Sequence, residues 1–267
     1  MNKDNPTEKT YRFFRTRAAR KLADNYGIGK LLTVGSANTK FGKTDSQTAV
    51  MIGLSLAQAK TSGFQVCNHA TRGCLSLCVG KSGLASVFKS IAQARKRKTR
   101  FYFEHPTEFL VLLEHEIAQQ YEKAYKLGLP IFGRLNVFSD LNWETIAPSL
   151  FEEFPDVQWY DYTKNARRYG RFLRGQLPEN YHLTRSFNET MTRRTVGRLL
   201  GDGGTVAVAF RNGKKREIPE TWNGFDVVDG DQDDRRCFDQ PGSIVGLRAK
   251  GRALNDRTGF VVDWGVE

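Results

Sequence analysis

The sequence contains no long hydrophobic run and few cysteines, and these two absences narrow the class of protein. No segment approaches the roughly 18 consecutive apolar residues that a membrane-spanning helix requires, so we expect no membrane partner. The first residues, MNKDNPTEKTYRFF, have no apolar stretch after their charges and do not resemble a secretory signal. We therefore expect a cytoplasmic protein, in which the four cysteines stay reduced and serve as metal ligands rather than disulfides.

Low-complexity stretches, internal repeats and a clear interdomain linker are also absent. A chain of 267 residues with evenly mixed polar and apolar segments can bury one substantial core. We therefore predict a single α/β domain over residues 1–267. Within it, residues 1–28 are expected to form an N-terminal basic helix, and residues 220–267 a β-rich tail packed on the rest of the domain.

Positive charge is present in excess. The chain has 41 Lys and Arg residues against 29 Asp and Glu residues, and the resulting net charge of +12 favours contact with polyanions. One concentrated run consists of Arg95, Lys96, Arg97, Lys98 and Arg100. Two interpretations of this run stay open: a solvated helix face, or a surface that binds nucleic acid through its phosphates.

The periodicity of the apolar residues predicts an α/β fold. Helices are expected over residues 82–102 and 107–127, and helical patterns also follow most of the later strand-like segments. The strand-like segments lie at 31–35, 48–57, 130–138, 157–163, 181–187 and 205–210. Successive strand–helix units with short connections favour parallel strands covered by helices. We therefore predict a full or partial (β/α) barrel with a cysteine-rich loop and a small C-terminal β-rich cap.

Three of the four cysteines lie within twelve residues, as Cys67, Cys74 and Cys78. Gly73 and Gly80 flank them and allow the backbone to wrap tightly, with amide groups directed towards sulfur. Thiolates gathered so closely need neutralisation, and a metal centre provides it most directly. The alternative is a chance cluster of free cysteines.

The spacing favours iron over zinc. Structural zinc sites usually pair cysteines two to four residues apart, whereas the intervals here are six and three residues. His69, another candidate zinc ligand, lies between Cys67 and Cys74, which leaves little chain to wrap an ion. Iron–sulfur clusters accept more varied spacings, and three cysteines can hold a [4Fe-4S] cluster. The fourth ligand would be Cys237, an exogenous molecule or a side chain other than cysteine.

Residues 54–80, LSLAQAKTSGFQVCNHATRGCLSLCVG, resemble the cysteine-rich signature of the phage gene product eighty-eight family. Further similar segments follow in the same order, at 133–144, 159–164, 183–190 and 244–253. The resemblance implies a phage-type origin, hence a host cytoplasm, and an important cysteine loop. It implies no particular activity.

Polar residues follow the predicted strands at equivalent positions, where the carboxyl ends of parallel strands would meet. We predict catalytic roles for Asp140, Glu144, Asp161, Lys164 and Glu189. Asn136 and Ser186 are predicted to contribute to cofactor binding. Each also has a simpler interpretation, as a helix cap or as one member of an ion pair.

Three classes of function stay open. The first is a cluster-bearing protein that binds or acts on nucleic acid. The second is an enzyme resembling the radical S-adenosylmethionine enzymes, which hold a cluster with three cysteines and leave one iron for that cofactor. The cysteine spacing differs from the C-x3-C-x2-C of those enzymes, and Leu77 stands where they carry an aromatic residue. The third is an interaction protein with a structural zinc site.

Overall fold

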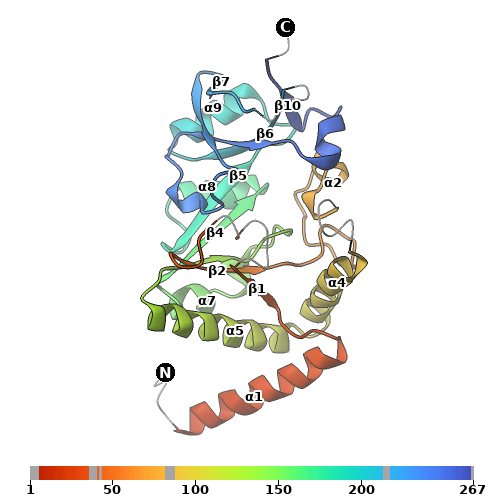
Figure 1. The fold of residues 1–267 in the computed structure, drawn as a ribbon, viewed down its shortest axis with the longest axis vertical. Helices are drawn as coiled ribbons and strands as arrows, with labels where there is room; N and C mark the ends of the chain where they lie inside the picture. Colours follow the sequence, from red (N-terminus) through yellow and green to blue (C-terminus); the bar gives the residue numbers. More distant parts are fainter. Residues whose placement is uncertain (1–5, 36–40, 42–43, 82–87, 213–216, 266–267) are drawn as a thin grey trace.

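The computed structural model describes residues 6–35, 41, 44–81, 88–212 and 217–265 (Figure 1). Its centre is a ten-stranded sheet in the order β1-β2-β3-β4-β5-β6-β9-β8-β7, with β10 also paired to β6. The strands are β1 (Leu32–Val34), β2 (Val50–Leu54), β3 (Ile131–Arg134), β4 (Val157–Thr163), β5 (Tyr181–Ser186), β6 (Val206–Arg211), β7 (Thr221–Trp222), β8 (Phe225–Asp229), β9 (Ile244–Arg248) and β10 (Val261–Asp263).

Every pairing from β2 across the sheet to β8 is parallel, whereas β1 and β7 are antiparallel strands at the two edges. The predicted α/β class with parallel strands is therefore confirmed. The described pairings do not close the sheet into a ring. A full or partial barrel stays a prediction.

Helices cover the sheet and connect its strands. They are α1 (Pro6–Asn25), α2 (Arg72–Ser76), α4 (Lys89–Glu104), α5 (Pro106–Leu127), α6 (Trp143–Ile146), α7 (Ser149–Glu153), α8 (Ala166–Leu173) and α9 (Arg193–Gly201), with short 3₁₀ turns η3 (Val79–Lys81), η4 (Arg236–Phe238) and η5 (Gly251–Asn255). The first part of the predicted helix over 82–102 falls on residues 82–87, which lie outside the described ranges. Within those ranges, no helix is both long and apolar enough to span a membrane.

Helix α5 follows from its sequence. Pro106 occupies the first turn, where its missing N–H costs nothing, and Gly128 ends the helix with a left-handed φ of 63°. Phe109, Leu112 and Leu113 recur at helical spacing and are fully buried. This apolar face packs into the main core beneath the sheet, together with Ala19 and Ala23 of α1 and the rings of Trp143 and Trp159.

The C-terminal region is rich in strands, and its role as a cap stays a prediction. Strands β9 and β8 continue the main sheet beyond β6, and β10 pairs with the second half of β6. The segment between β9 and β10 lies beside α2, which is visible in Figure 1 as the dark blue turn next to the orange helix. Leu77, which follows α2, packs with Ala253 of this segment and with Val261 of β10.

Candidate functional site

The cysteine loop connects β2, the first of the parallel strands, to α4. Thr71 starts α2 by accepting a hydrogen bond from the amide of Cys74 at 3.3 Å. The sulfur of Cys67 accepts the amide of Ala59 at 3.4 Å and lies 3.7 Å from the carbonyl oxygen of Phe138, beyond the end of β3. The loop therefore lies at the carboxyl ends of β2 and β3, where open parallel sheets bind their ligands.

The three loop cysteines are free thiols that lie within electrostatic reach of one another. Burial, with smaller contributions from the charges of Asp140, Cys78 and Cys74, raises the pKa of Cys67 to about 11. Burial also raises the pKa of Cys74. Without a metal the thiols of Cys67 and Cys74 are therefore protonated at neutral pH, and a bound metal would displace those protons.

Two cations flank these thiols. The ammonium group of Lys164 contacts Cys74 and opposes the rise in its pKa, and it also lies 5.4 Å from the centre of the Phe260 ring. The guanidinium of Arg95 is an electrostatic neighbour of Cys78 and lies 3.8 Å above the ring of Phe138. These cations would offset the negative charge of cysteine thiolates.

Glu189 anchors the cysteine loop to the end of β5. Its carboxylate accepts the amide of Gly73 at 2.7 Å and the hydroxyl of Thr71 at 2.8 Å. Burial opposes ionisation, but these hydrogen bonds hold the pKa of Glu189 below its ordinary value. Gly73 leaves no room for a side chain, because a Cβ there would lie 2.6 Å from Thr258 Oγ1 and 2.7 Å from Phe260 Cβ. The loop is thus held between Glu189 and the C-terminal segment.

Asp140 joins the cysteine loop to β4. Its amide donates to the carbonyl of Val66, one residue before Cys67, at 2.8 Å. Its carboxylate accepts the hydroxyl of Thr163 and the amide of Lys164, both at 2.8 Å, and lies 3.4 Å from Arg168 Nη1. This residue therefore fixes the end of β4, and with it Lys164, against the cysteines.

A buried polar network lies behind Asp140. Asp161 is fully buried and accepts hydrogen bonds from the amide and the side chain of Asn136 and from the Tyr181 hydroxyl, at 2.8, 3.1 and 2.8 Å. Burial raises the pKa of Asp161 to about 6. Glu144 is held by Arg168 Nη2 at 2.8 Å, and the same nitrogen donates to Tyr181. Asp161 therefore positions Asn136 and Tyr181, and Glu144 positions Arg168.

The structure brings Asp140 and Lys164 beside the loop cysteines and Glu189 against Gly73 of the same loop. It places Asn136, Glu144 and Asp161 in the buried network behind Asp140. Ser186 ends β5, and its carbonyl accepts Arg185 Nη1 at 3.2 Å. The catalytic and cofactor-binding roles of these residues stay predictions. No sequence pattern singled out Arg168, Tyr181 or Thr71 as site residues. An arginine in a helix and a tyrosine in a strand are too common to indicate a functional site.

Cys237 lies in a different neighbourhood. It belongs to η4 and packs against the cluster of Phe41, Met51, Phe132 and Tyr160. Its main charged neighbours are Arg235, Asp239 and Asp233, whereas those of Cys67 are Asp140 and the other two loop cysteines. Its role as a fourth ligand stays a prediction that this placement does not favour.

Several members of the basic run on α4 are turned towards the protein. Arg95 donates to the Gly80 carbonyl at 3.2 Å, Lys98 to that of Leu31 at 2.7 Å, and the exposed Arg100 to that of Ser62 at 3.3 Å. Burial lowers the pKa of Lys98 to about 8. Lys96 and Arg97 are partly exposed. A nucleic-acid interface on α4 stays a prediction, and these contacts do not favour it.

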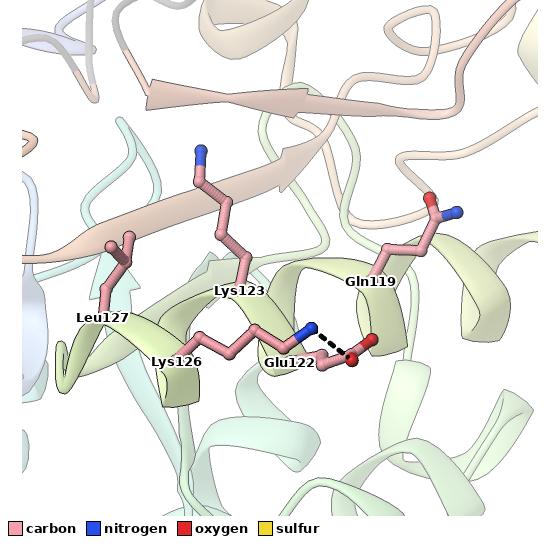
Figure 2. Close-up of a pocket in the computed structure, with 5 residues that line it drawn as sticks. All are labelled: Gln119, Glu122, Lys123, Lys126 and Leu127. Atoms are coloured by element: carbon pink, nitrogen blue, oxygen red, sulfur yellow. Dashed lines mark hydrogen bonds and ion pairs between the residues drawn. The ribbon is translucent and has the colours of Figure 1, made fainter.

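A surface concavity of about 380 Å³ lies on the flank of α5 (Figure 2), away from the loop that follows β2. Its lining residues are Gln119, Glu122, Lys123, Lys126 and Leu127. An ion pair of 2.7 Å joins Lys126 to Glu122 across one helical turn. Such pairs are ordinary on exposed helices, and none of the predicted site residues lies here.

The family model described as Gene product 88 matches residues 29–263, from just after α1 to the last residue of β10. The match covers all four cysteines and every predicted site residue, and it confirms the resemblance noted in the sequence. No curated protein and no solved structure matches the chain.

Proposed function

The chain belongs to the Gene product 88 family, and we propose that it binds a [4Fe-4S] cluster through Cys67, Cys74 and Cys78. One observation carries the proposal: the fold gathers three free thiols in one loop at the carboxyl ends of β2 and β3. A rigid parallel sheet supports this loop, and Glu189 and Asp140 hold it in place.

The intervals between the loop cysteines in the sequence suit a cluster better than a single zinc ion. A tetrahedral zinc ion with bonds of about 2.3 Å needs ligand sulfurs roughly 3.8 Å apart. Among the described residues, no three His, Cys, Asp or Glu side chains form a group that could hold a metal ion. In a cubane each cysteine binds a different iron atom, so its sulfur ligands lie further apart. The proposal of a cluster over a structural zinc site therefore rests on the intervals of six and three residues between the cysteines.

The surrounding charge also suits a cluster. Lys164 and Arg95 lie beside Cys74 and Cys78, where they would stabilise the added negative charge of thiolates and of a reduced cluster. A cluster in this loop would supply electron transfer or an iron atom that binds a further ligand. The residues of the chain would hold it, partly shield it from water and balance its charge.

A second candidate is an enzyme that leaves one iron open for S-adenosylmethionine. The observation in its favour is the position of Cys237, which packs around Phe132 and Tyr160 instead of joining the loop cysteines. With three protein ligands, one iron would accept an external group. Asp140, Glu144, Asp161 and Lys164 would then bind or orient that group and the substrate.

The family points to a phage origin, and we propose the host cytoplasm as the compartment, because reduced thiols persist there. We also propose that the protein binds or acts on nucleic acid, because its net charge of +12 favours contact with polyanions.

The test is anaerobic purification followed by analysis of iron, sulfide and zinc and by electron paramagnetic resonance. We expect about four iron and four sulfide per chain, lost in Cys67→Ala, Cys74→Ala and Cys78→Ala. Cys237→Ala is the matched control and should keep full occupancy. Stoichiometric zinc without sulfide would refute the proposal.

The enzyme candidate has its own test. S-adenosylmethionine should change the resonance spectrum of the reduced wild-type cluster and should be cleaved, and Cys237→Ala should behave in the same way. If a fully occupied cluster shows neither a spectral change nor cleavage, this candidate is ruled out, whereas the proposal of the cluster itself still holds.

A further inference from the structure

Helix α1 has one face on the core and one face open to solvent. Ala19 and Ala23 are buried at 1% and 0% exposure and pack with the residues of α5. Phe13 and Phe14 lie one to two helical turns before Ala19, and their side chains are 62% and 60% exposed. Figure 1 shows α1 at the end of the molecule, beyond α5, so its outer side faces no other element in that view.

The exposed aromatic rings share this face with cations. Arg17 and Lys21 follow Phe13 at intervals of four residues and are both exposed. Side chains four apart lie one above the other on a helix, so these cations stand about 6 and 12 Å along the axis from Phe13. The segment from 13 to 23, FFRTRAARKLA, contains no acidic residue. The outer face of α1, defined here as Phe13, Phe14, Arg17 and Lys21, therefore combines two rings with a row of positive charge.

We propose that the outer face of α1 binds single-stranded nucleic acid. Aromatic rings provide stacking platforms for unpaired bases, and a row of cations follows the phosphate backbone. Both kinds of group are present on this face and both are exposed. The proposal does not depend on the metal centre. It also differs from the predicted interface on α4, where Arg95 and Lys98 donate to backbone carbonyls of the protein.

Two other occupants fit less well. A symmetric contact between two copies would place Arg17 and Lys21 opposite the same cations of the partner, which is unfavourable. Insertion into a membrane surface needs a broad apolar face, and Ala19, Leu22 and Ala23 already pack into the core. The family match begins at residue 29, so the binding helix precedes the family-matched region.

The test is fluorescence anisotropy of the full-length protein with labelled oligothymidylate of about 20 nucleotides, long enough to exceed a typical single-strand site. Phe13→Ala/Phe14→Ala should weaken binding about tenfold or more, because each stacked base is lost. Arg17→Gln/Lys21→Gln should lower the slope of log affinity against log salt by about 1.4, at about 0.7 for each phosphate contact. Circular dichroism should show unchanged folding, since all four side chains are exposed.

Lys123→Gln/Lys126→Gln on α5 is the control, because it removes the same charge from another exposed surface. It should bind as the wild type does. Equal weakening in the control would overturn the proposal, as would wild-type binding by both α1 variants or no binding by the wild type. A dimer in sedimentation equilibrium that Phe13→Ala/Phe14→Ala dissociates would assign the face to a second copy. Co-sedimentation with anionic vesicles, without oligonucleotide binding, would assign it to a membrane.

Discussion

Gly73→Ala should displace the cysteine loop. The added Cβ would lie 2.6 Å from Thr258 Oγ1, 2.7 Å from Phe260 Cβ and 2.8 Å from Glu189 Oε2. The Thr258 hydroxyl can rotate away, but Phe260 Cβ is attached directly to the backbone and cannot. Either the loop or the C-terminal segment must therefore move.

Overpacking of this kind costs about 1–3 kcal/mol of unfolding free energy, which corresponds to a fall in melting temperature of about 2–12 °C for a chain of this size. The same movement would weaken the hydrogen bond between the Gly73 amide and Glu189 and shift Cys74, the next residue. We therefore expect lower iron occupancy after anaerobic purification as well as lower stability, measured by chemical denaturation.

Gly29→Ala is the matched control, because a Cβ at Gly29 has no neighbour within 4 Å and the residue has no left-handed φ. It should change stability by about 0.5 kcal/mol at most and leave iron occupancy unchanged. If Gly73→Ala behaves like Gly29→Ala in both measurements, the loop is not clamped as described.

Three further changes test the neighbouring contacts. Glu189→Gln should lower stability by about 1–2 kcal/mol and reduce iron occupancy, measured by denaturation and metal analysis; unchanged values would show that Glu189 does not anchor the loop. Arg168→Met leaves the buried Glu144 with only the distant Arg171, at 4.0 Å, as a cation and should cost about 3–5 kcal/mol, whereas the exposed Arg167→Met should cost little; equal costs in denaturation would contradict the buried network. Burial lowers the pKa of His182 to about 4, so its protonation opposes folding, and wild-type stability should fall by about 2–3 kcal/mol from this group as the pH drops from about 6.5 to 4. His182→Phe should lack that part of the fall in denaturation series at several pH values, and parallel curves for the two proteins would refute the assignment.

The difference between the two pH series isolates His182. Burial raises the pKa values of Asp161 and Asp239 to about 6, so these carboxyls make folding less favourable as the pH rises from about 4 to 6. Their contribution has the opposite sign, but it is present in both proteins and cancels in the comparison.

Local patterns in the sequence were sufficient to predict much of the fold. The apolar spacing and the Gly128 boundary predict α5 within a residue, and the alternation after it predicts β3, β4, β5 and β6 as parallel strands. The sequence left the pairing of the C-terminal strands open, and in the structure β8 and β9 extend the main sheet. Strand pairing depends on partners far along the chain, and a short strand carries little information about which edge it joins.

By itself, the sequence determined the α/β class, the family and the presence of three cysteines in one loop, because periodicity, motif order and spacing are local properties. Only the tertiary structure decided what surrounds that loop. It placed Lys164 beside Cys74 and Glu189 on Gly73, put Cys237 in another cluster, and turned Arg95 and Lys98 of the basic run inward. The physical reason is that the sequence does not show which way the side chain of a cysteine or of a charged residue points. Its partner depends on packing between segments that lie tens of residues apart.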